Sequence, residues 1–211
     1  LAMSTLEMQR VRVNPELTMR ASKRLADATF QLTTGQYLDL AFEKAEDISL
    51  TSYWHMIKGK TGALLGACFG IAAILAEKND ESVAALNSLG INLGIAFQVQ
   101  DDFLGVFGDE RITGKSVNSD LVERKKTYPI LYGLQNIPEF SILWKKSADF
   151  TENDLLQLKS ILGQNEVQEN TRKISRELFE KVEHEYQILF GGDEKAELLH
   201  GLVVQLLDRI K

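Results

Sequence analysis

The feature that most constrains the fold is a helical periodicity that runs through almost the whole chain. Apolar residues recur three and four positions apart, in segments bounded by capping residues and glycines. No stretch shows the convincing alternation of apolar and polar residues that marks a half-buried strand. The 211 residues are enough for one domain, and 44% of them are hydrophobic, which is enough for a packed core. The sequence therefore predicts an all-α fold and a single helical domain over residues 1–211.

Capping signals indicate where the helices begin. An Asn-Pro-Glu sequence at 14–16 predicts a helix that runs to about residue 45. Ser49 or Thr51 caps a helix that reaches residue 58, and glycines at 59 and 62 predict a break or kink there. Asn79-Asp80 caps a long apolar helix. The remaining predicted helices lie at about 62–77, 81–107, 128–136, 151–163, 166–189 and 193–210.

The composition excludes several classes of function. The net charge is -6 and no basic stripe is present, which argues against nucleic-acid binding. The single cysteine, Cys68, cannot form an internal disulfide; we expect it to be buried and the protein to be cytoplasmic. The longest charge-free apolar run covers fifteen residues, 62–76, whereas a membrane-spanning helix needs about 20. The sequence therefore predicts no transmembrane segment.

Residues 108–127 interrupt the helical pattern with a charged loop. Loops of this length inside a compact helical domain are uncommon and usually functional. We expect the loop to be mobile without ligand and to become ordered when a ligand binds.

A polar stripe precedes this loop on the long apolar helix. Gln98, Asp101, Asp102 and Gly105 are spaced to lie on one helical face. Adjacent carboxylates are costly to bury and repel each other unless a cation compensates them. One interpretation is simply a solvated helix end, and the other is a cation-dependent site.

Three lysines favour the second interpretation. Lys60 lies between two glycines, Lys115 follows Gly114, and Lys125 begins a Lys-Lys-Thr sequence. Each alone is typical of a solvated surface residue. Together with the carboxylate pair they offer what a magnesium–diphosphate site needs, because Mg²⁺ binds one or two carboxylates plus phosphate oxygens while lysines neutralise the remaining charge.

In these motifs the sequence resembles the trans-prenyltransferases, also called polyprenyl diphosphate synthases. The motifs occur in the family's order and approximate spacing, and the likeness covers nearly the whole chain. They are Gly-Gln-Tyr-Leu-Asp-Leu at 35–40, Lys60-Thr61, and the segments 97–104, 108–109, 113–115, 119–121 and 125–129.

The resemblance implies an antiparallel helical bundle of the isoprenoid-synthase type around a central cavity. It implies a head-to-tail condensation in which an allylic diphosphate ionises, isopentenyl diphosphate attacks the cation, and a proton is lost. It also implies Mg²⁺ as the cofactor and a homodimer. The family site carried onto this chain consists of metal ligands Asp101 and Asp102, diphosphate-binding Lys60, Lys115 and Lys125, cation-stabilising Thr61 and Gln98, and pocket-wall Gln36 and Asp39.

Two departures from the family pattern matter. Gly105 stands in the third place of the second aspartate-rich motif, where the usual residue is Asp. The first aspartate-rich motif is absent, and Leu1 aligns partway along a helix that should follow it. We therefore expect this chain to be the C-terminal two-thirds of a longer protein, and the product length stays open between farnesyl, geranylgeranyl and longer chains.

Two alternatives remain at this level. The missing motif is compatible with a non-catalytic subunit of a two-part prenyltransferase. The same fold also serves terpene cyclases, but these carry an Asn/Ser/Glu metal motif on a later helix, and the nearest match, residues 118–120, has the wrong spacing.

Overall fold

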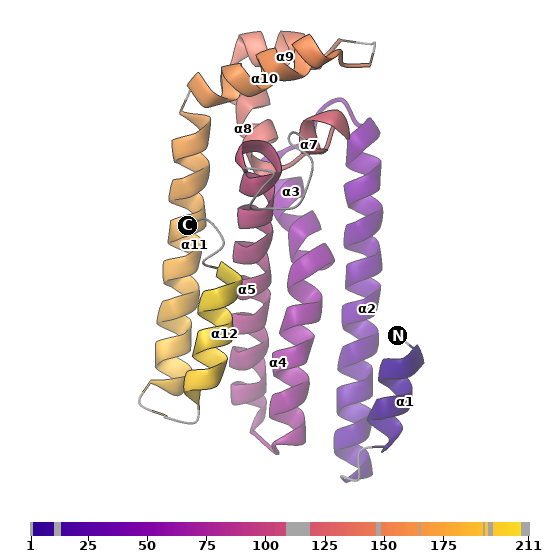
Figure 1. Cartoon of the computed structure of the whole chain (residues 1–211). Coiled ribbons are helices and arrows are strands. Elements are labelled where there is room, and N and C mark those ends of the chain that lie inside the picture. The colour runs from indigo at the N-terminus through magenta and orange to yellow at the C-terminus, as the bar shows by residue number, and fades with distance from the viewer. Residues whose placement is uncertain are drawn as a thin grey trace.

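The computed structural model describes residues 2–10, 14–108, 119–146, 149–164, 166–191, 193 and 196–207. All the secondary structure within these residues is helical, which confirms the all-α prediction. The four longest helical stretches run side by side with alternating direction (Figure 1). They are α2 (Pro15–Lys44), α3 (Leu50–Ile57) continued by η1 (Lys58–Gly62) and α4 (Ala63–Leu75), α5 (Asp80–Phe107), and α11 (Val167–Phe190).

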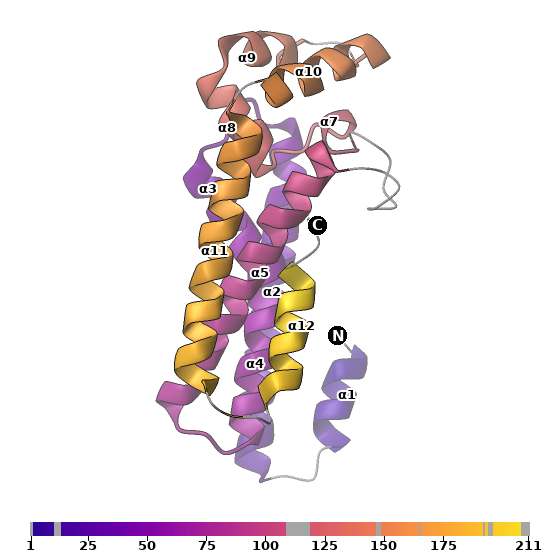
Figure 2. The same cartoon turned by 60° about the vertical axis from the view of Figure 1, so that its left-hand side comes forward.

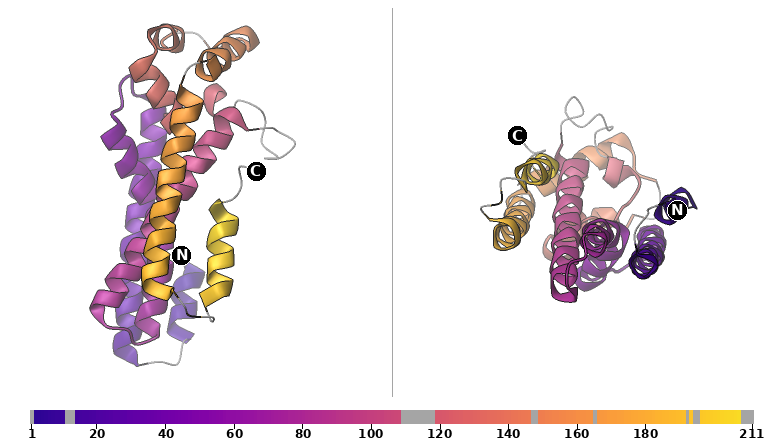
Figure 3. Two further views of the ribbon diagram at one scale, coloured as in Figure 1. Left: turned by 90° about the vertical axis from the view of Figure 1, so that its left-hand side faces the viewer. Right: turned by 90° about the horizontal axis from the view of Figure 1, so that it is seen from below.

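Shorter helices surround this bundle. Figure 2 shows α9 (Pro138–Trp144) and α10 (Glu152–Gln164) lying across one end, above α8 (Tyr128–Asn136) and α7 (Ser119–Val122). α1 (Ala2–Arg10) lies beside α2, and α12 (Glu197–Leu207) packs on α5. Seen from below in Figure 3, the long helices form an arc rather than a closed ring. The sequence prediction missed the short helices α7 and α9, whereas α1 lies where the resemblance places a helix at the start of the chain.

The capping residues act as the sequence predicts. The side chains of Asn14, Ser49 and Asn79 accept hydrogen bonds from backbone N–H groups of the first turns, at 2.8–3.0 Å. They satisfy donors that a helix start otherwise leaves unpaired. At α10, Thr151 and Asp154 bond reciprocally, with the Thr151 hydroxyl accepting from the Asp154 N–H at 3.2 Å. This is a capping box, and it fixes the start of α10, which lies across the end of the bundle.

At Gly59–Gly62, where the sequence predicts a break or kink, the helix does not end. The chain instead continues from α3 to α4 through one π-helical turn, η1. The glycines serve close packing: a Cβ at Gly35 of α2 would lie 2.2 Å from the Lys60 backbone nitrogen, and one at Gly94 would lie 2.7 Å from the Gly62 Cα. Because α2 and α5 approach η1 backbone to backbone, the π-turn is held between them.

Two stretches, 50–75 and 80–107, are long and apolar enough to cross a membrane by length and composition alone, which is weak evidence. Both lie inside the bundle, where α4 and α5 pack against each other and against α2 and α11. The expected burial of Cys68 is wrong, because Cys68 is exposed. It shares an outward face of α4 with the exposed Leu64, one turn earlier.

Candidate active site

A polar pocket of about 330 Å³ lies where η1 meets the C-terminal part of α5. α2 and the segment joining α7 to α8 complete its walls. Glycine contacts bring the backbone of η1 against α2 and α5, so side chains from three helices converge here. The pocket is lined by Asp39, Met56, Ile57, Lys60, Gln98, Asp101, Asp102, Asp120, Glu123, Lys125, Lys126 and Thr127.

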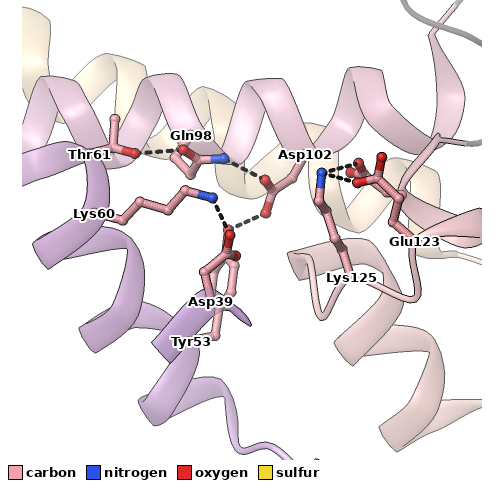
Figure 4. Close-up of polar contacts among 9 residues, drawn as sticks. Asp39, Tyr53, Lys60, Thr61, Gln98, Asp102, Glu123 and Lys125 are labelled. Carbon is pink, nitrogen blue, oxygen red and sulfur yellow. Dashed lines mark hydrogen bonds and ion pairs between the residues drawn. The ribbon is translucent and has the colours of Figure 1, made fainter. Parts of the chain in front are cut away.

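A chain of hydrogen bonds links η1 to α5 (Figure 4). The Thr61 hydroxyl donates to Gln98 Oε1 at 2.6 Å, and Gln98 Nε2 donates to Asp102 Oδ1 at 2.9 Å. Gln98 and Asp102 are one helical turn apart, as the predicted stripe requires. The chain fixes the orientation of the Gln98 amide, so its carbonyl oxygen faces Thr61.

Asp102 is buried beneath this chain. Its Oδ2 accepts from the Tyr53 hydroxyl at 2.7 Å and from the Tyr128 N–H at 3.2 Å. Burial raises the pKa of Asp102 to about 6, although the hydrogen bonds from Gln98, Tyr53 and Tyr128 act in the lowering direction. Burial and the neighbouring Asp102 charge hold the pKa of Tyr53 well above its usual value. Asp102 thus ties α3, α5 and α8 together.

Asp101 differs from its neighbour because it is only half-buried. Both carboxylates line the pocket. Within the described residues, no group of three or more His, Cys, Asp or Glu side chains could hold a metal ion. A pair of carboxylates nevertheless fits Mg²⁺ bound together with phosphate oxygens and water.

Two of the lysines that line the pocket, Lys60 and Lys125, are paired with carboxylates. Lys60 Nζ lies 2.5 Å from Asp39 Oδ2 (Figure 4). Lys125 Nζ lies 2.5 Å from Glu123 Oε2 and 3.8 Å from Asp120 Oδ1. Partial burial alone would lower the pKa of Lys125, but its bond with Glu123 and the nearby carboxylates raise it above its ordinary value. Lys125 is therefore charged at neutral pH, and both lysines have anionic partners that a diphosphate could replace.

One buried group points to a missing ligand. Thr127 lines the pocket, and its Oγ1 is buried with no hydrogen-bond partner among the described residues. Buried hydroxyls are nearly always paired, so an unpaired one in a charged pocket needs an explanation. A ligand oxygen in the pocket would satisfy it.

Comparison with known proteins identifies the family. Residues 1–170 match the polyprenyl synthetase family, which is more than half of the chain. The chain belongs to the polyprenyl synthetase family. It is 33% identical over 197 residues to a geranylfarnesyl diphosphate synthase of Aeropyrum pernix, covering 93% of this chain and 62% of that protein. It is 36% identical over 143 residues to a geranylgeranyl diphosphate synthase of Mycobacterium tuberculosis, covering 66% of this chain and 41% of that protein.

Solved structures agree on the fold. A geranylgeranyl pyrophosphate synthetase from Pyrococcus horikoshii matches with a TM-score of 0.84 and 30% identity, covering 95% of this chain and 62% of that one. A geranylgeranyl pyrophosphate synthase matches with a TM-score of 0.89 and 27% identity, covering all of this chain and 66% of that one. The predicted isoprenoid-synthase fold is confirmed. The chain spans less than two thirds of the length of the curated relatives it matches.

The family's second aspartate-rich motif takes an unusual form here, and the structure gives a reason. A Cβ at Gly105 would lie 2.2 Å from Asp120 Oδ2 and 2.6 Å from its Cγ. The Asp120 carboxylate, from α7, therefore occupies the space that a side chain at 105 would need. A third carboxylate still lines this polyprenyl synthetase pocket, but it comes from a different helix.

Most of the predicted site residues come together in the pocket. Gln36 does not line it and is exposed on α2. Lys115 and most of the charged loop, 109–118, lie outside the described residues. The residues that gather at the pocket are Asp39, Lys60, Gln98, Asp101, Asp102 and Lys125, with Thr61 bonded to Gln98.

Sequence reasoning missed Tyr53 and the role of Arg124. Tyr53 lies seven residues, or two helical turns, before Lys60. This spacing is the signal in the sequence that could have placed both side chains on one helical face. Arg124 adopts a positive φ of 53° and donates from its guanidinium to the carbonyls of Trp144 and Lys146, both at 3.0 Å. It also lies 3.8 Å from the centre of the Phe150 ring. These contacts hold the residues around Lys125 against the C-terminal end of α9 and the segment that follows it. No local pattern in the sequence predicts them.

Proposed function

We propose that the protein is a Mg²⁺-dependent polyprenyl diphosphate synthase. It joins an allylic diphosphate to isopentenyl diphosphate head to tail and releases diphosphate. The observation that carries this proposal is the convergence of two lysines, the Thr61–Gln98–Asp102 chain and Asp101 around one pocket. Names of relatives, which include farnesyl, geranylgeranyl and geranylfarnesyl diphosphate synthases, support the same class of reaction.

The lysines bind the diphosphate of the allylic substrate. Lys60 exchanges Asp39 for a phosphate oxygen, and Lys125 exchanges Glu123. The freed carboxylates remain close enough to keep both ammonium groups in place. Thr127 donates its unpaired hydroxyl to the same group. Asp101 and Asp102 are the residues that would hold Mg²⁺, which would offset the diphosphate charge and make diphosphate a better leaving group. Lys115 is proposed to contribute a further ammonium group.

Thr61 and Gln98 face the carbon that becomes positive when the C–O bond to diphosphate breaks. Their oxygens present negative dipole ends without a full charge that could trap the cation. Asp102 orients Gln98 through its amide N–H₂. The new C–C bond forms from the double bond of isopentenyl diphosphate, and loss of one proton restores neutrality. Asp39 belongs to the wall on α2.

Assembly as a homodimer is also proposed, and α2 supplies the support. Its outer face exposes four large apolar side chains at helical spacing, Met19, Phe30, Tyr37 and Leu40, which are 54–75% exposed in the isolated chain. Such a stripe is typical of a helix that packs on a partner. Replacing Phe30 and Tyr37 by Glu should yield monomers in sedimentation, whereas Ile142→Glu on α9 should not. A cytoplasmic location is proposed with it.

The decisive experiment assays the full-length protein with isopentenyl diphosphate, allylic primers and Mg²⁺. We expect elongated prenyl diphosphates, and Lys60→Ala should raise the KM for the primer at least about tenfold. Lys58→Ala is the matched control, because Lys58 belongs to the same π-turn but is exposed. A cyclised hydrocarbon would favour a terpene cyclase. Activity only after addition of a second protein would favour the non-catalytic subunit.

A further inference from the structure

A second cavity, of about 510 Å³, lies along α2, α4 and α5, farther from α9 and α10 than the polar pocket. We call it the groove; it is lined by Arg20, Lys23, Arg24, Asp27, Ala28, Gln31, Ala63, Ala67, Ile74, Asp80, Val83, Ala84, Asn87 and Ile91. The groove and the polar pocket are separate cavities that follow one another along the same helices. Ala63 follows Lys60 by one turn, and Ile91 precedes Gln98 by two turns, so each pair shares a face.

Between Arg24 and the pocket, small apolar side chains form much of the wall of the groove, beside the exposed Asp27 and Gln31 of α2. Ala28 of α2, Ala63 and Ala67 of α4, and Ile91 of α5 line it. These side chains offer a hydrocarbon chain contact without any polar group to desolvate. A prenyl chain whose diphosphate lies at Lys60 would extend along this surface.

Arg24 crosses the groove beyond these walls. Its side chain leaves α2 and lies against Gly70 of α4, where a Cβ would be 2.9 Å from Arg24 Cδ and 3.2 Å from Nε. Its Nη1 then donates to Asn87 Oδ1 of α5 at 2.6 Å. The pair therefore spans all three helices. One turn farther from the pocket, Arg20 pairs with Asp80 in the same way.

This bridge is a chemical barrier as well as a steric one. A hydrocarbon chain that reached it would have to strip water from a guanidinium and break its bond to the amide. Gln98 and Asn87 are eleven residues apart on α5, which is about 16 Å at 1.5 Å per residue. The part of the groove between the reacting centre and the Arg24–Asn87 bridge is therefore of limited and defined length.

We propose that Arg24 and Asn87 together form the floor of the groove and set the length at which the growing prenyl chain stops. The inference rests on the proposed function, because it assigns the groove to the tail of that substrate. Neither residue touches the reacting atoms, so both determine specificity and not the rate of the chemical step.

The test compares Arg24→Ala with Arg20→Ala in the full-length protein. The first opens the floor, and the second removes the same side chain one turn deeper while leaving the Arg24–Asn87 bridge intact. We expect Arg24→Ala to shift the main product by at least one isoprene unit, with an unchanged KM for isopentenyl diphosphate. Arg20→Ala should give the wild-type product. Identical product lengths in all three proteins would overturn the proposal, as would equal shifts in both variants.

A binding measurement keeps the proposal testable without turnover. Unreactive allylic thiodiphosphates of increasing chain length are titrated into the protein with Mg²⁺. Wild-type affinity should fall beyond one length, and Arg24→Ala should bind the next longer analogue about tenfold more tightly than wild type. Asn87→Ala serves as the second variant if Arg24→Ala misfolds, which melting curves detect. If no analogue binds at any length, the proposed function fails; if all bind with the same cutoff in each variant, only the floor assignment fails.

Discussion

The polar pocket and the groove are built on the same three helices, yet they are closed in different ways. At the pocket, glycines let η1 touch α2 and α5 backbone to backbone, and charged side chains pair across the gap. At the groove, α4 carries Gly70 against the flexible side chain of Arg24 instead. The first arrangement leaves the backbone little freedom to shift, which suits chemistry that depends on the position of the reacting atoms. The second arrangement fixes only a depth, which chain-length selection requires.

The largest difference between the pocket and the groove should appear when one carboxylate is removed from each. Asp101→Ala should lower turnover by about 10²-fold or more, because it removes a ligand for the charge that stabilises the leaving diphosphate. Asp27→Ala removes an exposed carboxylate from the groove and should leave turnover within about twofold. Steady-state kinetics with saturating Mg²⁺ measures both. An equal loss of turnover in both variants would mean that the overall charge of the protein, and not a local site, governs turnover.

A methyl group added at the pocket tests the backbone contact. In Gly35→Ala the new Cβ would lie 2.2 Å from the Lys60 nitrogen, so backbone must move, and we expect a stability loss on the order of 3 kcal/mol. Gly163→Ala is the control, since nothing lies within 4 Å of a Cβ there and helix propensity should make it neutral or slightly stabilising. Urea unfolding gives both values. A Gly35→Ala protein as stable as wild type would show that α2 and η1 are not in backbone contact.

The buried carboxylate of the pocket should make stability depend on pH in Mg²⁺-free buffer. The pKa of Asp102 is about 6 when folded, whereas an unfolded aspartate titrates near about 3.9. Between these values the folded state binds more protons, so stability falls as pH rises through this window. The effect is on the order of 1–3 kcal/mol and is complete above the folded pKa.

Asp102→Asn removes this titration. The melting temperature of the variant relative to wild type should therefore increase from pH 4 to pH 7. Asp27→Asn, the same substitution at an exposed site in the groove, is the matched control. A constant difference between Asp102→Asn and wild type across the range would contradict a buried, titrating Asp102.

Local signals predicted the helices and the residue types of the pocket. Capping side chains at Asn14, Ser49 and Asn79 act within one turn of themselves, so their effect can be inferred from neighbouring residues. The stripe at Gln98–Asp102 follows from helical spacing in the same way. Family resemblance then supplied roles for Lys60, Lys125 and their neighbours, because those motifs keep their order and spacing.

Contacts between distant segments could not be predicted. Whether a glycine ends a helix or admits a neighbour depends on what packs there, which is why Gly59 and Gly62 suggested a break and the structure has a π-turn. The Arg24–Asn87 bond joins residues 63 positions apart, and the Asp120 carboxylate fills the space beside Gly105 from another helix. Nothing near Arg24 or Gly105 in the sequence marks either contact.

The smallest expected effect on stability comes from Gly70→Ala, the groove's counterpart of Gly35→Ala. The new Cβ would lie 2.9 Å from Arg24 Cδ, an atom of a flexible side chain that can move aside. The gain in helix propensity, up to about 1 kcal/mol, should offset the displacement, so the free energy of unfolding should change by less than about 1 kcal/mol. Arg24 should nevertheless be pushed off Asn87, and the products should lengthen in the same direction as with Arg24→Ala, but to a smaller extent. A large loss of stability would place backbone at this contact, as at Gly35. Unchanged products with unchanged stability would mean that the Arg24 side chain moves aside and still keeps its bond to Asn87.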